Sequence, residues 1–450
     1  MSSLTRLACI ALAAAPCLAQ ADTAGDVQAL RDEIQAMRAQ YEARIRALEA
    51  RIEAAQPAST QAATSTAAPA TGPTPSGTGF NPALSLVLSG LYTRTSRDPA
   101  AYRVSGFALP ADAQAGPGTR GFSLAESELG LAANIDPWFS GNVNISFHPD
   151  NSVSVEEAFV QTTSLGNGLT LKAGRFLSSV GYLNSQHAHT WDFADAPLAY
   201  QAMLGTQVAD DGVEAAWLAP TDMFLEARAA VGRGRSYPGS DTSRNGAGMA
   251  SLALHAGGDI GDSSNWRAGV SLLDAKANGQ RVTSFDGSLA PRADAFNGRT
   301  RVWIADAVWK WAPNGNATRT SFKLQGEYLR STRSGTLVAD VDVAASAAPY
   351  RAGQSGWYLQ GVYQFMPRWR VGLRTERLDG GSPDYGLNAA LFANENWRPR
   401  KTSAMLDFSP SEFSRLRLQY AQDRARPGPA DGQWFLQYQM SLGAHGAHSY

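Results

Sequence analysis

Apolar and polar side chains alternate with a period of two over most of the chain after residue 83. In residues 433–442, one parity carries Trp434, Leu436, Tyr438, Met440 and Leu442. This alternation indicates a β-strand with one apolar face and one polar face. Comparable segments predict sixteen strands, near residues 84–92, 124–135, 142–148, 153–163, 169–175, 207–218, 223–232, 246–257, 265–275, 300–311, 319–330, 355–366, 369–378, 398–408, 414–424 and 432–443.

The connections between these segments differ in length in a regular way. Those after even-numbered strands are tight, as at Asp136-Pro137 and Pro367-Arg368, whereas most of those after odd-numbered strands are long. An up-and-down membrane barrel with both termini in the periplasm has short turns at one end and long loops at the other. We therefore predict an all-β transmembrane fold over residues 80–450, a 16-stranded antiparallel up-and-down β-barrel.

The first 79 residues predict three further segments. Residues 1–21 fit a secretory signal peptide, which contains both cysteines of the chain, so the mature chain has no thiol. Residues 25–55 predict an α-helix with a heptad-spaced apolar seam, either an oligomeric coiled coil or a solvated amphipathic helix. Residues 56–79 are rich in Pro, Ala, Thr, Ser and Gly and predict a flexible linker.

Composition narrows the expected location and partners. The 39 basic and 40 acidic residues leave no net positive charge for nucleic acid. No stretch of 18 apolar residues predicts a membrane-spanning helix. We expect the Gram-negative outer membrane with a periplasmic N-terminal extension. The expected partners are outer-membrane lipid and lipopolysaccharide, the barrel-assembly machinery through the aromatic Tyr450, and peptidoglycan through the coiled coil.

The polar parity of each strand must face the lumen and carries charges of both signs. The predicted basic wall consists of Arg267, Lys323, Arg370, Arg374, Arg415 and Arg417. The predicted acidic wall consists of Glu126, Glu128, Glu214 and Glu226. Opposed walls of this kind would impose a transverse field on a passing solute. The alternative is that these charges only hydrate the wall and pair with their neighbours.

The third long loop, residues 176–206, is unusually aromatic for an exposed loop. We predict that it folds inward and constricts the bore, with Asp192 and Asp195 opposite the basic wall. The residues assigned to this constriction loop are Tyr182, His187, His189, Trp191, Asp192 and Asp195.

Within this loop, His187 and His189 together with Asp192 are candidate ligands for zinc, because imidazole and carboxylate suit this ion. The alternative is hydrogen bonding of both imidazoles to the loop backbone and the barrel wall. No other cofactor is expected. The chain has neither a Gly-x-Ser-x-Gly nor a His-Glu-x-x-His motif, and we expect no enzymatic activity.

Strand count, loop asymmetry, the loop at 176–206 and the terminal aromatic make the chain resemble the porin superfamily, especially sixteen-strand and phosphate-selective-type porins. Segments 80–83, 126–129, 181–189 and 441–448 resemble a proteobacterial outer-membrane family often labelled zinc-regulated TonB-dependent receptor.

The porin resemblance implies a homotrimeric channel for passive diffusion of small polar or charged solutes. The second resemblance implies an outer-membrane receptor or uptake protein for zinc or a metal chelate. Receptors of that kind resemble 22-stranded barrels with a plug domain, for which this sequence has no segment.

Overall fold

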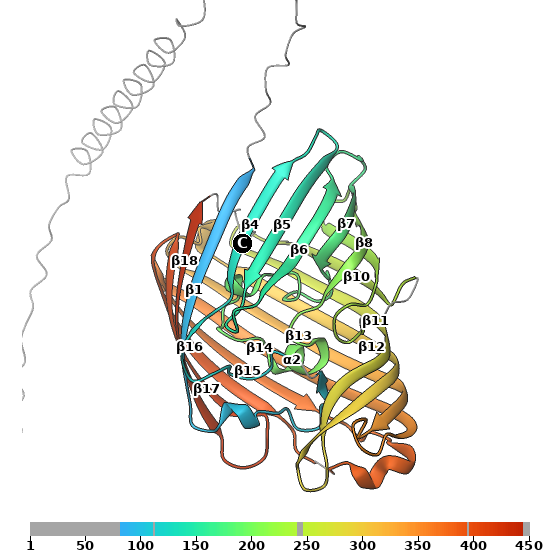
Figure 1. The fold of residues 1–450 in the computed structure, drawn as a ribbon. Helices are drawn as coiled ribbons and strands as arrows, with labels where there is room; N and C mark the ends of the chain where they lie inside the picture. The colour runs from blue at the N-terminus through green and yellow to red at the C-terminus, as the bar shows by residue number, and fades with distance from the viewer. Residues whose placement is uncertain (1–81, 111–112, 241–245, 394–395, 444–450) are drawn as a thin grey trace, which may run out of the picture. The chain divides into compact units, whose positions relative to one another are not determined.

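The computed structural model describes residues 82–110, 113–240, 246–393 and 396–443, and their strands close into one antiparallel barrel (Figure 1). The strands are β1 (Ala83–Thr95), β2 (Leu109–Pro110), β3 (Gly121–Leu124), β4 (Ser127–Asn134), β5 (Phe139–Phe147), β6 (Val153–Thr162), β7 (Leu169–Leu177), β8 (Ala209–Leu218), β9 (Phe224–Gly232), β10 (Met249–Ile260), β11 (Ser264–Phe285), β12 (Pro291–Trp311), β13 (Ser321–Ala339), β14 (Ser346–Met366), β15 (Trp369–Asp379), β16 (Arg400–Ser411), β17 (Ser414–Arg424) and β18 (Asp431–Gly443). The signal peptide, the coiled coil and the linker that the sequence predicts lie outside the described residues.

These segments make sixteen strands of the barrel wall, as predicted. Both β3 and β4 pair with β1, so they are two parts of one strand, and β2 is a two-residue segment within a loop. Each remaining strand pairs with its sequence neighbours, and β1 closes the ring against β18 from Ser85 opposite Gly443 to Thr95 opposite Gln433. Closure satisfies the backbone groups that an open sheet edge would leave unpaired in lipid.

The outer surface of the barrel is apolar. On β18, Trp434, Leu436 and Tyr438 are exposed, whereas Gln433 and Gln437, which have the opposite parity, are buried on the lumen side. This is the reverse of a soluble domain and matches a strand with one face toward lipid. Among the described residues, no helix is long and apolar enough to cross a membrane.

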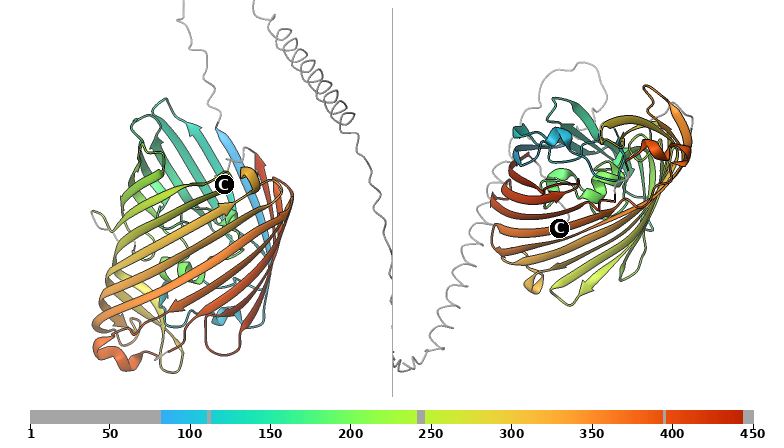
Figure 2. Two further views of the ribbon diagram at one scale, coloured as in Figure 1. Left: turned by 180° about the vertical axis from the view of Figure 1, so that it is seen from behind. Right: turned by 90° about the horizontal axis from the view of Figure 1, so that it is seen from below.

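Strands β11 to β14 continue well beyond the predicted ends at the long-loop end of the barrel (Figure 2). Strand β11, for example, reaches Phe285, although its alternating pattern stops near residue 275. The pairing of β11 with β12 persists to Phe285 opposite Pro291. Much of the sequence that we expected to be loop is therefore strand, because backbone pairing continues where the outer face no longer needs apolar residues.

The segment between β7 and β8, residues 178–208, lies inside the barrel, and we call it the lumen loop. It contains the 3-10 helix η2 (Ala188–Thr190) and the helix α2 (Leu198–Leu204), every residue of which is buried. Figure 1 shows α2 within the ring of strands. The apolar core of the molecule sits here, where Leu198 and Met203 of the loop cluster with Leu329 and Tyr358 of the wall.

The segment between β1 and β3 also crosses the interior, and we call its described residues, 96–110 and 113–120, the mouth loop. Its strand β2 pairs with β11, which lies on the opposite side of the ring from β1. Val104 and Phe107 join the core of the lumen loop. The remaining short helices are η1 (Pro99–Ala101), η3 (Pro313–Gly315) and η4 (Gly386–Leu391).

Candidate functional site

Two aspartates attach the lumen loop to the basic side of the barrel. Asp192, which is 5% exposed, contacts Lys323 of β13 and lies 3.3 Å from Arg370 of β15. Burial alone would raise the pKa of Asp192, but these two cations hold that pKa well below its usual range. The Asp192 carboxylate is therefore stabilised in its ionised form by the two cations.

Asp195 makes the second attachment. Its carboxylate accepts hydrogen bonds from Arg374 (2.8 Å) and Gln419 (2.7 Å) and contacts Lys401. Burial opposes ionisation, but Lys401 and Arg374 lower the pKa of Asp195 well below its usual range. Arg374 is itself fixed by Glu376 at 2.7 Å, so the pair belongs to a buried network.

The other basic residues that the sequence singled out also contact the lumen loop. Arg417 donates to the backbone carbonyl of Trp191 at 2.9 Å, and Arg415 donates to that of His189 at 2.7 Å. Arg267 lies with its guanidinium carbon 5.5 Å from the ring centre of Tyr182. The basic wall therefore binds the loop directly, through side chains and main chain.

A further anchor, Glu327 of β13, was not predicted from the sequence. Its carboxylate accepts from the backbone N–H of Tyr182 (3.2 Å) and Leu183 (3.0 Å) and from the hydroxyls of Tyr200 (2.8 Å) and Tyr358 (2.6 Å). The sequence did contain a signal for Glu327, because this residue has the same parity as the lumen-facing residues of its strand. Nothing in the sequence indicated which distant groups it would meet.

On the opposite side, the two loop histidines meet carboxylates of β4 and β6. His187 Nδ1 lies 3.1 Å from both Glu128 and Glu156, and its Nε2 lies 3.1 Å from Glu157. Burial lowers the pKa of His187, but hydrogen bonds to these carboxylates outweigh that effect and raise the pKa well above its ordinary value.

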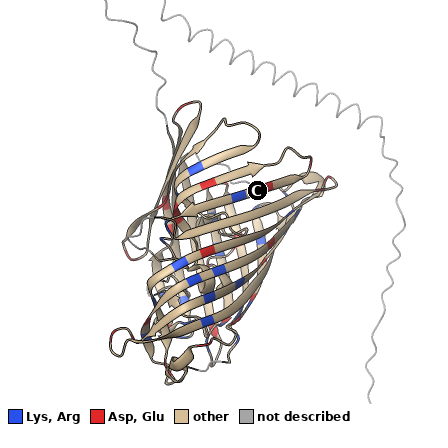
Figure 3. Ribbon diagram, turned by 90° about the vertical axis from the view of Figure 1, so that its right-hand side faces the viewer, with Lys and Arg blue, Asp and Glu red and all other residues tan. Residues whose placement is uncertain are grey.

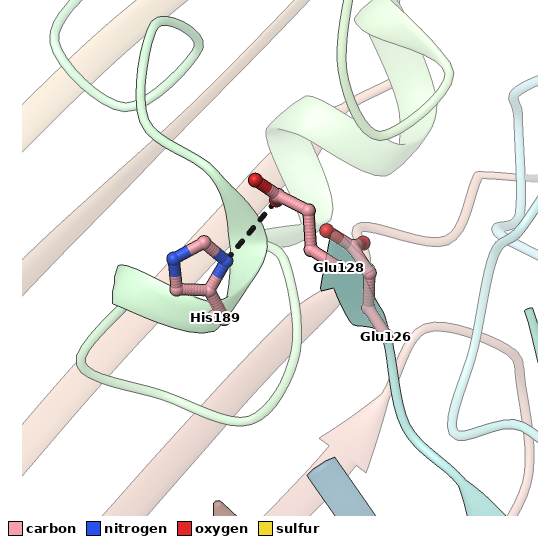
Figure 4. A group of neighbouring side chains, drawn as sticks. All are labelled: Glu126, Glu128 and His189. Atoms are coloured by element: carbon pink, nitrogen blue, oxygen red, sulfur yellow. Dashed lines mark ion pairs between the residues drawn. The ribbon is translucent and has the colours of Figure 1, made fainter. Parts of the chain in front are cut away.

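His189 extends this cluster. Its Nδ1 lies 3.3 Å from Glu128, and Figure 4 shows Glu126 beside this pair. Glu126, Glu128 and His189 offer ligand atoms within 4.8 Å of one another, and so do Glu128, Glu156 and His187. We call these five residues the His-Glu cluster. The predicted third ligand, Asp192, lies apart from it and pairs with cations instead.

The paired glutamates of β6 reach the same side of the wall because the strand is irregular. The register between β5 and β6 shifts between Asn144 and Ile145, so that Asn144 faces Glu157 and Ile145 faces Val155. Glu156 is the extra residue, and such a bulge re-aims a side chain. Both Glu156 and Glu157 therefore contact His187, which simple alternation does not predict.

The remaining acidic residues that the sequence singled out are neutralised locally. Glu214 and Glu226 lie 2.9 and 2.8 Å from Arg228, and Glu226 also lies 3.1 Å from His255. Ser179 of the lumen loop donates to Glu214 at 2.6 Å. The acidic residues thus form two groups, one facing the loop histidines and one around Arg228.

A closed sixteen-strand ring with an apolar exterior and a charged interior defines the protein as a transmembrane β-barrel. No protein-family model matches the chain. An uncharacterized protein of Aquifex aeolicus (strain VF5) is 32% identical to it over 353 residues, which cover 74% of this chain and 70% of that protein. The chain belongs to the same family as this Aquifex protein.

Three solved structures illustrate the likeness of the barrel. A loop-deletion mutant of the outer membrane protein OmpT of Vibrio cholerae is 9% identical, with 80% of this chain and 99% of that chain covered. The outer membrane channel DcaP of Acinetobacter baumannii is 12% identical, with 81% and 98% covered, and an anion-selective porin from Comamonas acidovorans is 11% identical, with 80% and 99% covered. The TM-score is 0.49 for each of the three. The barrel assignment rests on the strand pairing of the chain itself. The resemblance to zinc-regulated TonB-dependent receptors stays a prediction.

Proposed function

We propose that the protein is an outer-membrane channel for passive diffusion of small polar or charged solutes, with the lumen loop narrowing its bore. The observation that carries this proposal is the attachment of the loop across the interior. Asp192 and Asp195 bind the basic side, while His187 and His189 meet the acidic side. A segment tied to both sides of the lumen reduces the width available to a solute.

The same contacts support a preference for polar solutes. Charged side chains of both signs surround the loop, and they are held in position by ion pairs and hydrogen bonds rather than by solvent. A pore lined with fixed charges and hydrogen-bonding groups favours solutes that can exchange their hydration shell for such groups. We expect a homotrimer, as in the porin resemblance, and this assembly stays a prediction.

Planar-bilayer recording of the full-length protein tests the channel. We expect discrete conductance steps, and a larger step for the double variant Asp192→Asn/Asp195→Asn, because the loop loses its two anionic attachments. The matched control is Asp342→Asn, which removes an exposed ion pair with Arg281. A correctly folded wild-type barrel that conducts no ions would overturn the proposal.

The His-Glu cluster favours a second candidate function, the uptake of a zinc-like divalent cation. Donor atoms of His187 and His189 lie 3.1 and 3.3 Å from one oxygen of Glu128, which is the spacing expected between ligands placed about 2.0–2.2 Å from one ion. Asp192 is not part of this cluster, because its carboxylate pairs with Lys323 and Arg370 of the basic wall.

The chemistry of the side chains supports this candidate. Four carboxyl groups, those of Glu126, Glu128, Glu156 and Glu157, surround two imidazoles, and oxygen and nitrogen donors of this kind suit a zinc-like ion. One oxygen of Glu126 is buried and has no hydrogen-bond partner among the described residues. A divalent cation would supply the missing contact.

Zinc titration of the purified full-length protein, followed by metal analysis, tests this candidate. The variant His187→Ala/His189→Ala should lose binding, whereas His255→Ala, which removes a similar His–Glu pair outside the cluster, should keep it. Failure of the folded wild-type protein to retain zinc would exclude the metal function and leave the channel proposal standing.

A further inference from the structure

The outer face of the barrel carries a row of arginines at the long-loop end. Arg377 of β15 is the direct cross-strand partner of Arg400 of β16, which is in turn the partner of Arg424 of β17. Their sequence neighbours Glu376, Lys401 and Asp423 are buried toward the lumen, so the arginines point outward. Figure 3, which colours both faces alike, shows Lys and Arg on successive strands in the lower half of the barrel.

This arrangement is unfavourable without a counterion. Like charges directly opposite each other destabilise a pair of strands. In the described part of the chain, no acidic side chain forms an ion pair with Arg377, Arg400 or Arg424, and the nearby Asp379 pairs with Arg398 instead. The three guanidinium groups therefore present a concentrated positive charge to whatever covers this surface.

Tryptophans show where this surface lies relative to the bilayer. Outward-facing Trp357 is the cross-strand partner of Arg377. The same pairing recurs twice, since Trp303 of β12 faces Arg330 of β13, and Trp434 of β18 faces Arg94 of β1. Lipid-facing tryptophans concentrate at the level of the headgroups. The arginines beside them consequently lie at the polar boundary of the membrane rather than in its hydrocarbon core.

The two ends of the barrel differ in the side chains that neighbour their outward-facing aromatic residues. At the short-turn end, outward-facing aromatic residues contact one another, as Trp309 does with Phe322 and Trp369 with Phe408. No arginine of these strands takes part in those contacts. The long loops of outer-membrane barrels face the outside of the cell. The arginine row therefore faces the outer leaflet, where the lipid carries phosphate groups.

We infer that Arg94, Arg330, Arg377, Arg400 and Arg424 bind the phosphate groups of lipopolysaccharide in the outer leaflet. The planar guanidinium forms bidentate hydrogen bonds with phosphate oxygens, which a point charge does not. A phosphate seated between neighbouring arginines also removes their mutual repulsion. The row extends from β13 through β18 to β1, so that lipid would cover a broad arc of the barrel rather than a single pocket.

Binding of purified lipopolysaccharide to the full-length protein, counted by native mass spectrometry from detergent, tests the inference. Wild type should retain phosphorylated lipid about tenfold more strongly than the enzymatically dephosphorylated form. Arg377→Gln/Arg400→Gln/Arg424→Gln should lose that difference, and the corresponding lysine triple variant should recover only part of it. Arg281→Gln, an exposed arginine outside the row, is the control. Bilayer conductance of the glutamine variant should equal that of wild type, which separates this inference from the channel proposal.

Three results would overturn the inference. The first is unchanged lipid retention by the glutamine variant. The second is equal competition by free inorganic phosphate, which would indicate a small-anion site. The third is loss of subunit association without loss of lipid, which would indicate that the row belongs to a protein interface. If the triple variant does not fold, Arg400→Gln alone removes the central charge and should still lower lipid retention several-fold.

Discussion

Replacing Asp195 with Asn removes one negative charge from the buried network that holds the lumen loop and leaves the shape of the side chain almost unchanged. The hydrogen bond from Gln419 can persist to the amide oxygen, but Arg374 and Lys401 lose a shared anion. Both cations are 1% exposed, so water cannot replace it. The substitution therefore tests whether this ion pair keeps the loop in the lumen.

The expected loss of docking free energy depends on the anions that remain beside Arg374 and Lys401. Removing one partner of a buried ion pair costs about 3–5 kcal/mol. Glu376 stays 2.7 Å from Arg374, and Asp423 stays 3.6 Å from Lys401, so neither cation is left without an anion. We take the lower end, about 3 kcal/mol. At about 1.4 kcal/mol for each factor of ten, the undocked population of the loop should rise about 100-fold.

Amide hydrogen exchange of residues 180–204, measured on the full-length protein in lipid nanodiscs, reads this population. Exchange should accelerate by that factor in the loop, while the strands β13 to β17 keep wild-type protection. Asp342→Asn, at an ion pair whose side chains are more than half exposed, should behave as wild type. Unchanged exchange in a folded Asp195→Asn barrel would refute the assignment of the ion pair as the loop's attachment.

Three further outcomes are expected. Glu327→Gln should accelerate amide exchange in the lumen loop, because a carboxylate that accepts four hydrogen bonds becomes an amide with its own donors. The free energy that holds the loop in the lumen should fall by about 1–3 kcal/mol. Unaltered protection of the loop would contradict this prediction. Gly181→Ala should make the loop more susceptible to protease, since Gly181 has φ +67° and an added Cβ would lie 2.3 Å from Glu327; resistance equal to wild type would show that the site relaxes freely. Because the pKa of Asp195 is lowered on folding, its contribution is present above the unfolded value of about 3.9 and is lost as pH falls through the folded value; the difference in loop exchange between wild type and Asp195→Asn should therefore stay constant from pH 7 to about pH 4, and a difference already lost at pH 5 would be inconsistent with the pairing.

The strand pattern could be read from the sequence wherever lipid meets the wall. Trp434, Leu436 and Tyr438 alternate with buried residues, which are polar except for Phe435, because one face of β18 contacts hydrocarbon and the other faces the lumen. Beyond the bilayer this requirement ends. Outward positions such as Arg299 and Ser334 are polar, so the continuation of β12 and β13 leaves no alternation to detect although the strands pair without interruption there.

For the contacts between the lumen loop and the barrel wall, the sequence predicted some of the residues involved but not all of their partners. Parity identified Arg374 and Arg417 as lumen residues, and the aromatic, acidic composition of the loop predicted that Asp195 would lie opposite them. The bulge that brings Glu156 beside His187 depends on local backbone geometry. Lys401 and Asp407 complete the buried networks through pairing across strands, which spacing along the chain does not encode.

The sequence separation of the loop contacts has a consequence for biogenesis. Asp195 precedes Lys401 by 206 positions, and Trp191 precedes Arg417 by 226 positions. The lumen loop is therefore synthesised long before the strands that bind it, and contacts between distant residues form late because a long segment of chain must first be ordered. Assembly must carry a charged, aromatic segment in an undocked state until β15 to β17 join the sheet. A shortened loop should consequently leave barrel closure intact, whereas loss of the last strands should leave the loop with nothing to dock on.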